Sequence, residues 1–466
     1  LYLITTKSAE KLYMSYAVKN SEGAALMPSY IIRSMRKMFS HCLKLSYKDT
    51  AQQNSYVTIP QASFSFDNTE TAANVDEDII DSLTGGRLVG SVTSFENFAE
   101  CPLRYYLRYG VDLKEREEFT FSPVNFGVVL HAVIREVCDE IKKNGESYYL
   151  ISEEKRREMV KRSVAAITDI YQNSILKDSS RNSFMIKRME DLADRTIWAM
   201  GEQLKCGDFV PFVFEHKFNM EVGDGDRKQL MSGTIDRVDI CENDTDVYVR
   251  IIDYKTGKKD FNIVKTYYGI DIQLMVYMEA AMKLVAKMRP GKNVIPAGVF
   301  YYNISDPIVS ATTESAEEIE DKIKGELRLK GMVNSDKDIA EKMDNTEGTS
   351  LNIPVSRKAD GGFDSRRSKV MNTEQFNMLG RFVDVRAVDT ADRIAGGDIR
   401  RSPYKDGQFS SCDRCPYGAV CGFSVDLPGC NYRKLKKFDD EILWNNIKEG
   451  VDENGKKMDT GAEERD

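Results

Sequence analysis

The chain has 466 residues, of which 41% are hydrophobic and 30% charged, and its formal net charge is −8. This length and composition predict a soluble globular protein of two or more domains. The negative charge excludes a uniformly basic nucleic-acid coat but leaves room for a locally basic channel. No apolar run reaches the roughly 18 residues that a membrane-spanning helix needs. With nine cysteines, no secretory signal and no dense disulfide framework, a reduced cytoplasmic setting is expected.

The first 90 residues divide into two segments. Residues 1–18, LYLITTKSAEKLYMSYAV, have the pattern of a strand, a helical turn and a second strand. They begin the segment 1–45, which is predicted to be the C-terminal remnant of a first domain. Residues 46–90 are rich in Ser, Thr, Asn, Asp and Gln and predict a linker. Because the chain begins at Leu1 and not at Met, we expect a truncated or processed N-terminus.

A second domain is predicted over 91–438, and it opens with SVTSFENFAECPLRYYLRYG. In this stretch Thr93 and Glu96 match a capping box, and the helix that they begin is expected to carry Cys101. The next helix, FGVVLHAVIREVCDEI, repeats apolar residues at helical spacing and so predicts a core-facing side. Helical residues continue to about Leu204.

A β region is predicted from Phe212 to Tyr254, and a helix over 271–288 and an apolar strand over 296–304 follow it. The charged stretch 314–343 is expected to be an exposed helical insertion. Acidic residues are frequent over 439–466, which predicts a solvated C-terminal tail.

Two strand-like runs in GTIDRVDICENDTDVYVRIIDYKTGKK, residues 233–259, flank a turn-rich centre and predict a β-hairpin. Folding this hairpin about its midpoint places Asp236 opposite Asp253, so that both carboxylates point to the same face. Lys255 follows Asp253 by two residues on the same strand and shares that face. The alternative is a pair of ordinary strand-end acids that are solvated or paired in salt bridges.

These two acids would be costly to bury without a positive charge between them, because like charges repel strongly in a low dielectric. The apolar run that leads into Asp253 makes its burial expected. Mg²⁺ binds a few carboxylates and completes its shell with water. The hairpin therefore predicts a Mg²⁺ site at Asp236 and Asp253.

The motifs GVVLH, GTIDRVD, IIDYKTG and QLMVY, in this order, resemble those of the RecB-like branch of the PD-(D/E)XK nucleases. The resemblance implies an α/β fold, with a mixed sheet flanked by helices, and metal-dependent hydrolysis of DNA phosphodiesters. It also implies that His131, Asp236 and Asp253 bind the Mg²⁺ ion. For His131 the alternative is a packed histidine at the flank of an apolar helix face.

By the same resemblance, Lys255 orients or activates the attacking water and stabilises charge on the phosphorane. Gln273 and Tyr277, one helical turn apart, match a Q-x-x-x-Y motif and position the site or the DNA. Glu215, in FVFEHKF, falls where many members carry an acidic residue, and its role is left open.

The cysteines Cys412, Cys415 and Cys421 have the spacing of neither a zinc ribbon nor a small ferredoxin. Cys430 would complete a local zinc site, which stays open as an alternative. The resemblance implies instead a 4Fe–4S cluster, since related nucleases carry one cysteine before the nuclease core and three after it. Cys101 occupies that first position. The cluster would then join the two ends of the nuclease domain, as a structural staple or, alternatively, as a redox centre.

Basic and aromatic residues follow Cys101 closely. Arg104, Tyr105 and Arg108 would contact a DNA backbone or stack on bases. For the tyrosine, packing in the core is the alternative.

The stretch LYLITTKSAEKLYMSYA resembles motif VI of UvrD-like helicases, with Thr6-Lys7-Ser8 where that motif has T-R-A. The chain contains no G-x-x-x-x-G-K-[ST] sequence, so it is not expected to hydrolyse ATP by a P-loop mechanism. A helicase-like end followed by an iron–sulfur RecB-like nuclease resembles the AddB family, the second subunits of bacterial AddAB helicase–nucleases.

This second resemblance implies an AddA-like motor subunit as heterodimeric partner, DNA as substrate, and cutting of the 5′-ended strand during resection of double-strand breaks. Two alternatives stay open. A Cas4-like or stand-alone iron–sulfur exonuclease would share the nuclease motifs without needing the helicase-like leader. A non-catalytic iron–sulfur DNA-binding module would not need Asp236, Asp253 and Lys255, all of which are present.

Overall fold

The computed structural model describes residues 89–463 except 115–122, 171–179, 223–228, 311–314 and 428–429, and before residue 89 only 14, 16, 25–27, 29–38 and 74–76. The chain divides into two compact units, 1–67 and 68–466. In the first unit the described residues include helix α2 (Tyr30–Met38). The helicase-like motif at Thr6-Lys7-Ser8 and most of the predicted linker lie outside the described residues. Among the described helices, none is both long and apolar enough to cross a membrane.

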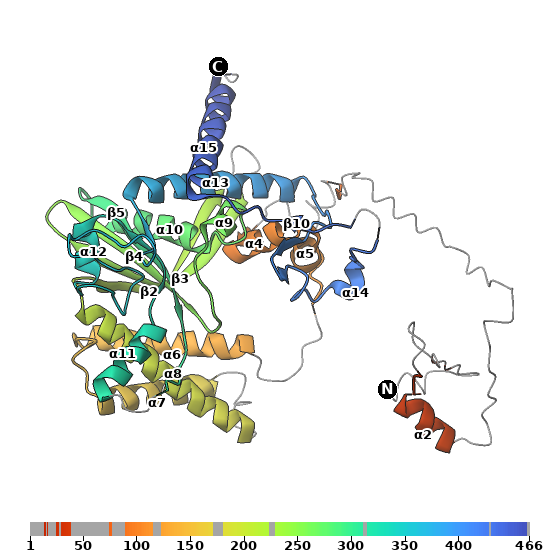
Figure 1. Cartoon of the computed structure of the whole chain (residues 1–466), viewed down its shortest axis with the longest axis horizontal. Helices are drawn as coiled ribbons and strands as arrows, with labels where there is room; N and C mark the ends of the chain where they lie inside the picture. Colours follow the sequence, from red (N-terminus) through yellow and green to blue (C-terminus); the bar gives the residue numbers. More distant parts are fainter. Residues whose placement is uncertain are drawn as a thin grey trace. The chain divides into compact units, whose positions relative to one another are not determined.

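A mixed sheet forms the centre of the second unit (Figure 1). Its described strands are β1 (Val89–Ser91), β2 (Val210–Val222), β3 (Gln229–Glu242), β4 (Asp246–Lys255), β5 (Asn293–Asn303), β6 (Lys330–Asn334) and β7 (Val370–Met371). β3 pairs antiparallel with β2 along one edge, and β1 and β4 share its other edge. β5 is parallel to β4 and antiparallel to β6, which is parallel to β7.

Strand β4 shows why the sequence forms this sheet. Its run of β-branched and aromatic residues is buried on both faces, as expected for a central strand. Val249 and Ile251 belong to the core on one face, whereas Tyr248 and Ile252 belong to the core on the other. The sheet thus separates two hydrophobic cores, because successive side chains of a strand point to opposite sides.

One face of the sheet is covered by α6 (Pro123–Lys143), α7 (Glu153–Ile170) and α8 (Ser180–Lys205), as Figure 1 shows. The apolar stripe predicted for α6 is buried there, and Leu130 and Val133 are inaccessible to solvent. This burial confirms the core-facing side that the helical spacing indicated.

The other face is covered by α10 (Gln273–Met288) and α13 (Thr373–Ala395), with α4 (Val92–Glu100) and α9 (Ile263–Tyr267) beside them (Figure 1). A mixed sheet with helices on both faces confirms the predicted α/β architecture.

The stretch 314–343, expected to be an exposed helical insertion, is built differently. It contains α11 (Ala316–Glu326), the sheet strand β6 and α12 (Lys337–Met343). Residues 331–334 are buried, and residues 330–333 pair with β5. The expectation was wrong because β6 is too short to show a clear alternation of polar and apolar residues, and charged residues flank it on both sides.

The acidic C-terminal segment also differs from the solvated tail that was expected. It forms α15 (Asp440–Glu463), which packs on α13 (Figure 1). Leu443 and Ile447 are buried in the core that contains α10 and α13. Over residues 440–452, charged residues therefore occupy the outer side of a helix whose inner side is apolar.

The segment before α6 and the segment after α13 meet at one end of the second unit. The first segment contains α5 (Pro102–Tyr105) and the π-helical turn η1 (Tyr106–Gly110). The second contains α14 (Gly418–Cys421) and a small sheet of β8 (Tyr404–Asp406), β9 (Phe409–Ser410) and β10 (Arg433–Lys434).

Hydrogen bonds join these two segments. Leu103 N donates to Arg400 O at 3.3 Å, and the Tyr417 hydroxyl donates to Leu113 O at 2.9 Å. The Arg433 guanidinium also donates to Ala99 O. Residues that are far apart in sequence are therefore held in contact here.

Candidate active site

The site lies where β3 and β4 diverge. Arg237 pairs with Ile252 at the end of the β3–β4 ladder, so the next residues in register are Asp236 and Asp253. The backbone N–H of Tyr254 donates to Asp236 Oδ2 at 2.6 Å. The hairpin register predicted from the sequence is therefore confirmed.

The negative charge of the buried Asp253 carboxylate is only partly balanced by its neighbours. It is 3% exposed, and its Oδ2 lies 2.7 Å from Lys255 Nζ but receives no well-aligned hydrogen bond from any described residue. Burial, together with the charge of Asp236, raises the pKa of Asp253 to about 6, although Lys255 acts in the opposite direction. A bound cation would relieve both effects, because it would add a positive charge beside the two carboxylates.

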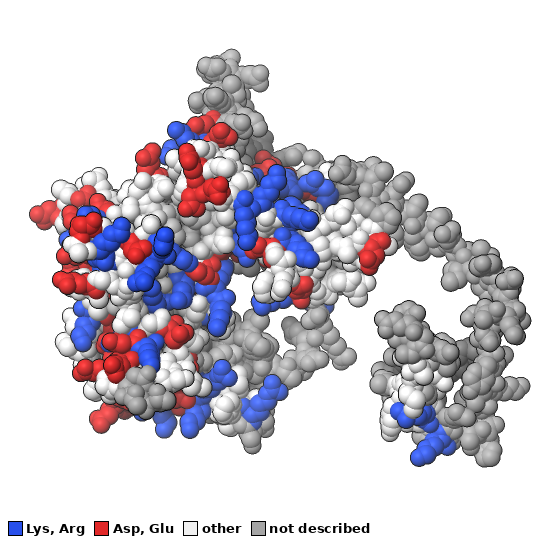
Figure 2. All heavy atoms as spheres, viewed as in Figure 1, with Lys and Arg blue, Asp and Glu red and all other residues white. Residues whose placement is uncertain are grey.

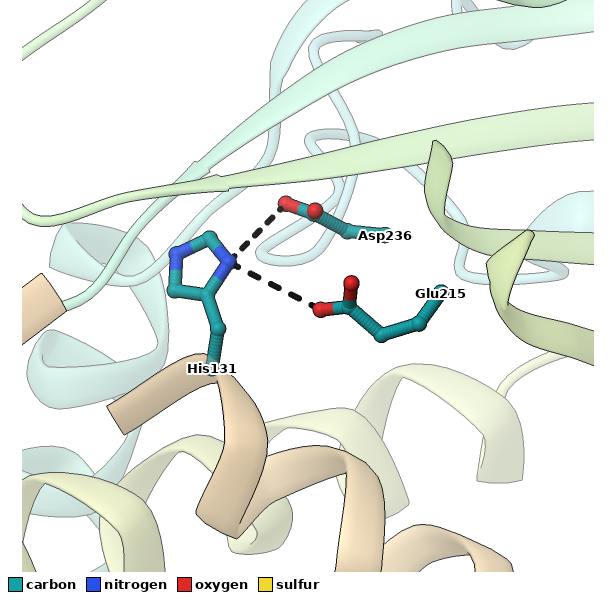
Figure 3. Close-up of side chains that lie close together, drawn as sticks. All are labelled: His131, Glu215 and Asp236. Atoms are coloured by element: carbon teal, nitrogen blue, oxygen red, sulfur yellow. Dashed lines mark ion pairs between the residues drawn. The ribbon is translucent and has the colours of Figure 1, made fainter. Parts of the chain in front are cut away.

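His131, Glu215 and Asp236 form a second part of the site, which we call the metal-site group (Figure 3). They come from α6, β2 and β3, and their ligating atoms all lie within 4.8 Å of one another. His131 Nδ1 is 3.5 Å from Asp236 Oδ2 and 4.0 Å from Glu215 Oε1. One imidazole and two carboxylates form a donor set that suits a divalent cation.

The charges in the metal-site group shift each other's protonation. Burial by itself would lower the pKa of His131, but the hydrogen bond and charge of Asp236 raise it above its ordinary value. Burial and the nearby Asp236 carboxylate also raise the pKa of Glu215. The acids therefore repel each other unless a positive charge lies between them.

Glu215 has an unusual backbone for a strand residue. Its φ angle of 48° is in the left-handed region, although its neighbours Phe214 and His216 pair regularly with β3. A non-glycine residue in this region is strained, and such strain is typical of functional sites. The sequence suggested only that an acid belongs here, whereas the structure brings its carboxylate to Asp236.

Lys255 belongs to a chain of hydrogen bonds that leads to α10. Its Nζ donates to Gln273 Oε1 at 2.9 Å, and Gln273 Nε2 donates to the Tyr277 hydroxyl at 2.9 Å. Gln273 and Tyr277 are 7% and 5% exposed, so their positions are restricted by packing. The two residues of the Q-x-x-x-Y motif therefore hold the lysine rather than lie at the surface.

A group of charged residues beside this chain was not predicted from the sequence. Lys259 Nζ lies 3.0 Å from Asp271 Oδ1, which also accepts a 2.7 Å hydrogen bond from the Tyr301 hydroxyl. Glu96 Oε1 accepts the backbone N–H of Gln273 at 3.0 Å. The expected capping box was wrong, because Ser91 caps α4 and Glu96 points to α10 instead.

Four cysteines line one small cavity, which we call the cysteine cavity. They are Cys101, Cys412, Cys415 and Cys421, and Leu103, Leu107, Pro403 and Phe423 are among the other residues around them. Cys430 is buried but does not belong to this lining. Burial raises the pKa of the Cys101 thiol. Four thiols around one largely apolar cavity fit a soft metal or an iron–sulfur cluster.

The residues proposed for DNA contact differ in their exposure. Tyr105 is buried and packs edge-on against Phe98, so packing describes its role better than stacking on a base. Arg104 pairs with Glu100 and lines the cysteine cavity. Arg108 is exposed and lies over the Tyr109 ring at 5.3 Å. Of the three, Arg108 has the side chain most open to a partner.

The charge of the second unit is unevenly distributed on the face seen in Figure 2. Lys and Arg side chains gather over the region where β10 and the adjacent end of α13 lie, whereas many acidic side chains lie at the left of the view, around β5 and α12. A negative net charge is therefore compatible with a locally basic surface.

Residues 90–422 match the model of the PD-(D/E)XK nuclease superfamily. This match covers more than half of the chain, and the fold and the acid–lysine arrangement agree with it. The chain belongs to this nuclease superfamily.

Curated relatives give a more particular likeness. The chain is 31% identical to the B subunit of an ATP-dependent helicase/deoxyribonuclease of Caldanaerobacter subterraneus subsp. tengcongensis, with 100% of the chain and 45% of the relative aligned. Proteins of the same name from Clostridium acetobutylicum and Lachnoclostridium phytofermentans are 30% and 31% identical, over 98% and 100% of the chain and 44% of each relative. The chain thus spans less than half the length of these relatives.

Proposed function

We propose that the second unit is a Mg²⁺-dependent deoxyribonuclease that hydrolyses DNA phosphodiesters. The observation that carries the proposal is the buried Asp253 carboxylate, which lies opposite the Asp236 carboxylate and has the Lys255 ammonium 2.7 Å from its Oδ2. Such an arrangement is unfavourable in an empty site and favourable around a cation.

His131, Asp236 and Asp253 would hold the cation, and the position of Glu215 supports it as a further ligand or as an acceptor for a bound water. When bound, a divalent cation polarises the scissile phosphate and lowers the pKa of a coordinated water. The Asp236 carboxylate is kept in place by the Tyr254 N–H, which donates to its Oδ2.

Lys255 would orient the attacking water and stabilise the charge that develops on the phosphate. Its ammonium is held between Asp253 Oδ2 and Gln273 Oε1, so its direction is set before substrate binds. Preorganised charge of this kind lowers a barrier because no reorganisation is needed during the reaction.

Substitutions at the hairpin test this function. Asp253→Ala and Lys255→Ala are each expected to lower Mg²⁺-dependent DNA cleavage by about 10²-fold or more, as the loss of a positioned acid–base group does. The measurement is cleavage of end-labelled duplex DNA by the full-length protein, with Mg²⁺ and with EDTA.

Asp244→Ala and Lys258→Ala are matched controls, since both residues are exposed and lie on the same hairpin or just after it. They should cleave like the unaltered protein. Full activity in both Asp253→Ala and Lys255→Ala would rule out the proposed site.

We propose further that the cysteine cavity holds a 4Fe–4S cluster bound by Cys101, Cys412, Cys415 and Cys421. The proposal is supported by the convergence of these four thiols from the two ends of the nuclease core. The position of Cys430 outside the lining weighs against the local zinc site.

The broader role is proposed from the name of the relatives, which joins a helicase and a deoxyribonuclease in one protein. The chain would work in the cytoplasm within an AddAB-type heterodimer, beside an AddA-like motor, and cut the 5′-ended strand at double-strand breaks. Duplexes labelled at either the 5′ or the 3′ end test the polarity. Exclusive shortening of the 3′-ended strand would overturn it.

A further inference from the structure

Helix α10 begins without a cap of its own. Its N-cap residue is Ile272, whose side chain makes no capping hydrogen bond. The backbone N–H groups of a first helical turn need acceptors from outside the helix, and a negative charge is favourable there. Glu96 provides such an acceptor from α4, because its Oε1 receives the N–H of Gln273 at 3.0 Å.

The residue that Glu96 caps is the one that holds the catalytic lysine. Gln273 N binds Glu96, and Gln273 Oε1 binds Lys255 Nζ at 2.9 Å. The lysine in turn lies 2.7 Å from Asp253 Oδ2. Glu96 is therefore one residue away from Lys255 in a continuous chain of contacts, although it is distant in the sequence.

Charged residues surround Glu96 at the start of α10. Burial raises the pKa of Glu96 to about 7, and the Lys259 ammonium opposes that effect. Lys259 is itself held by Asp271, and it lies 4.5 Å from the centre of the Tyr301 ring. An acid that only formed a local cap or faced solvent would not accept a backbone N–H from a second helix.

We infer that Glu96 is a positioning residue of the nuclease site, which caps α10 and thereby fixes Gln273 and Lys255 for the attack on the phosphodiester. The inference rests on the proposed nuclease function and assigns to that site a residue outside the motifs that define it. Glu96 does not touch the reacting atoms, so it acts through Gln273.

Two variants of Glu96 test the inference in the full-length protein, purified anaerobically with its partner subunit. Glu96→Ala removes the acceptor and should lower kcat for DNA cleavage by about 10- to 100-fold, as the loss of a residue that orients a site does. KM for DNA should change by less than about twofold. Glu96→Gln keeps an oxygen that can accept the Gln273 N–H and should restore most of the activity.

Glu100→Ala is the matched control. It removes a carboxylate one turn further along α4 that pairs with Arg104. It should retain its iron and its kcat. A kcat for Glu96→Ala within twofold of the unaltered protein, a change confined to KM, or an equal loss in Glu100→Ala would each overturn the inference.

Amide hydrogen exchange supplies a readout that does not depend on cleavage. Glu96→Ala should speed exchange in the peptide that contains residues 271–277, while the α6 peptide stays protected. Unchanged exchange at 271–277 would contradict the capping role. If the unaltered protein cut no DNA, the proposed function would fail, and the exchange result would still decide whether Glu96 caps α10.

Discussion

Strands β3 and β4 carry two groups of buried charges, one around Asp239 and the other around Asp253, and the two groups differ in how the charge of the acid is balanced. Arg237 and Arg250 both bind Asp239, at 2.6 and 2.9 Å, and they lower the pKa of Asp239 in spite of its complete burial. The pKa of Asp253 is raised instead. The Asp239 carboxylate has two guanidinium partners within the protein, whereas the Asp253 carboxylate has the Lys255 ammonium at 2.7 Å and lies opposite a second acid, Asp236.

This difference predicts opposite effects of removing the two acids on the stability of the metal-free protein. Asp239→Asn leaves two buried guanidinium groups facing each other and should lower the free energy of unfolding by about 3–5 kcal/mol. Asp253→Asn removes an incompletely compensated charge and should leave stability unchanged or raise it. Urea unfolding in EDTA measures both variants. A loss in Asp253→Asn as large as that in Asp239→Asn would contradict the distinction.

At the level of elements, the packing of α10 against α13 brings two carboxyl groups together. Asp384 on α13 forms a hydrogen bond with Glu279 on α10. Burial, with the hydrogen bond and charge of Glu279, raises the pKa of Asp384 to about 8, and Lys283 opposes this effect. The contact between the helices therefore depends on a proton that the pair holds near neutral pH.

The stability of this helix contact should depend on pH. Because the folded pKa of Asp384 is raised, the folded state binds more protons than the unfolded state between pH of about 4 and 8. The protonated Asp384–Glu279 pair therefore contributes its full stabilisation below about pH 4, and this stabilisation is lost as the pH rises to about 8. Asp384→Asn cannot ionise, so its melting temperature should fall less between pH 5 and pH 8 than that of the unaltered protein.

Asp389→Asn is a suitable control for this experiment, since Asp389 is an exposed acid on the same helix. It should keep the pH dependence of the unaltered protein. Equal pH slopes in Asp384→Asn and in the unaltered protein would show that the pair does not hold the proton.

For the molecule as a whole, the cysteine cavity is the place where the two ends of the nuclease core meet. Cys101 directly follows α4, the helix that carries Glu96, so a cluster bound there would also anchor one side of the active site. A cross-link between distant segments restricts the unfolded chain most, because it closes the longest loop.

The cluster should be visible after anaerobic purification as a brown colour, with about four iron atoms per chain. Cys101→Ser should lose iron and lower the melting temperature, since it removes the ligand that joins the two ends. Cys430→Ser, outside the cavity lining, should keep the iron. A colourless protein with stoichiometric zinc, or equal iron loss in Cys430→Ser, would reject this ligand set.

Part of this structure follows from patterns within short stretches of sequence. The alternation in 233–259 predicts the hairpin and the opposition of Asp236 and Asp253, and the helical spacing around His131 predicts the buried face of α6. These features depend on the fixed periods of strands and helices, so neighbouring residues are enough to reveal them. The strand β6 was missed because its few residues are too short for such a period.

The sequence by itself predicted the α/β class and the paired acids with their lysine, and its resemblance to a known family predicted the four cysteines as a set. Only the tertiary structure decided that Glu215 turns its carboxylate to Asp236 and that Glu96 caps α10. Both contacts join elements that are separate in the chain, and one needs a backbone angle that a non-glycine residue seldom adopts. The local periodicity of the sequence predicts neither contact, because packing between distant elements determines which side chains meet.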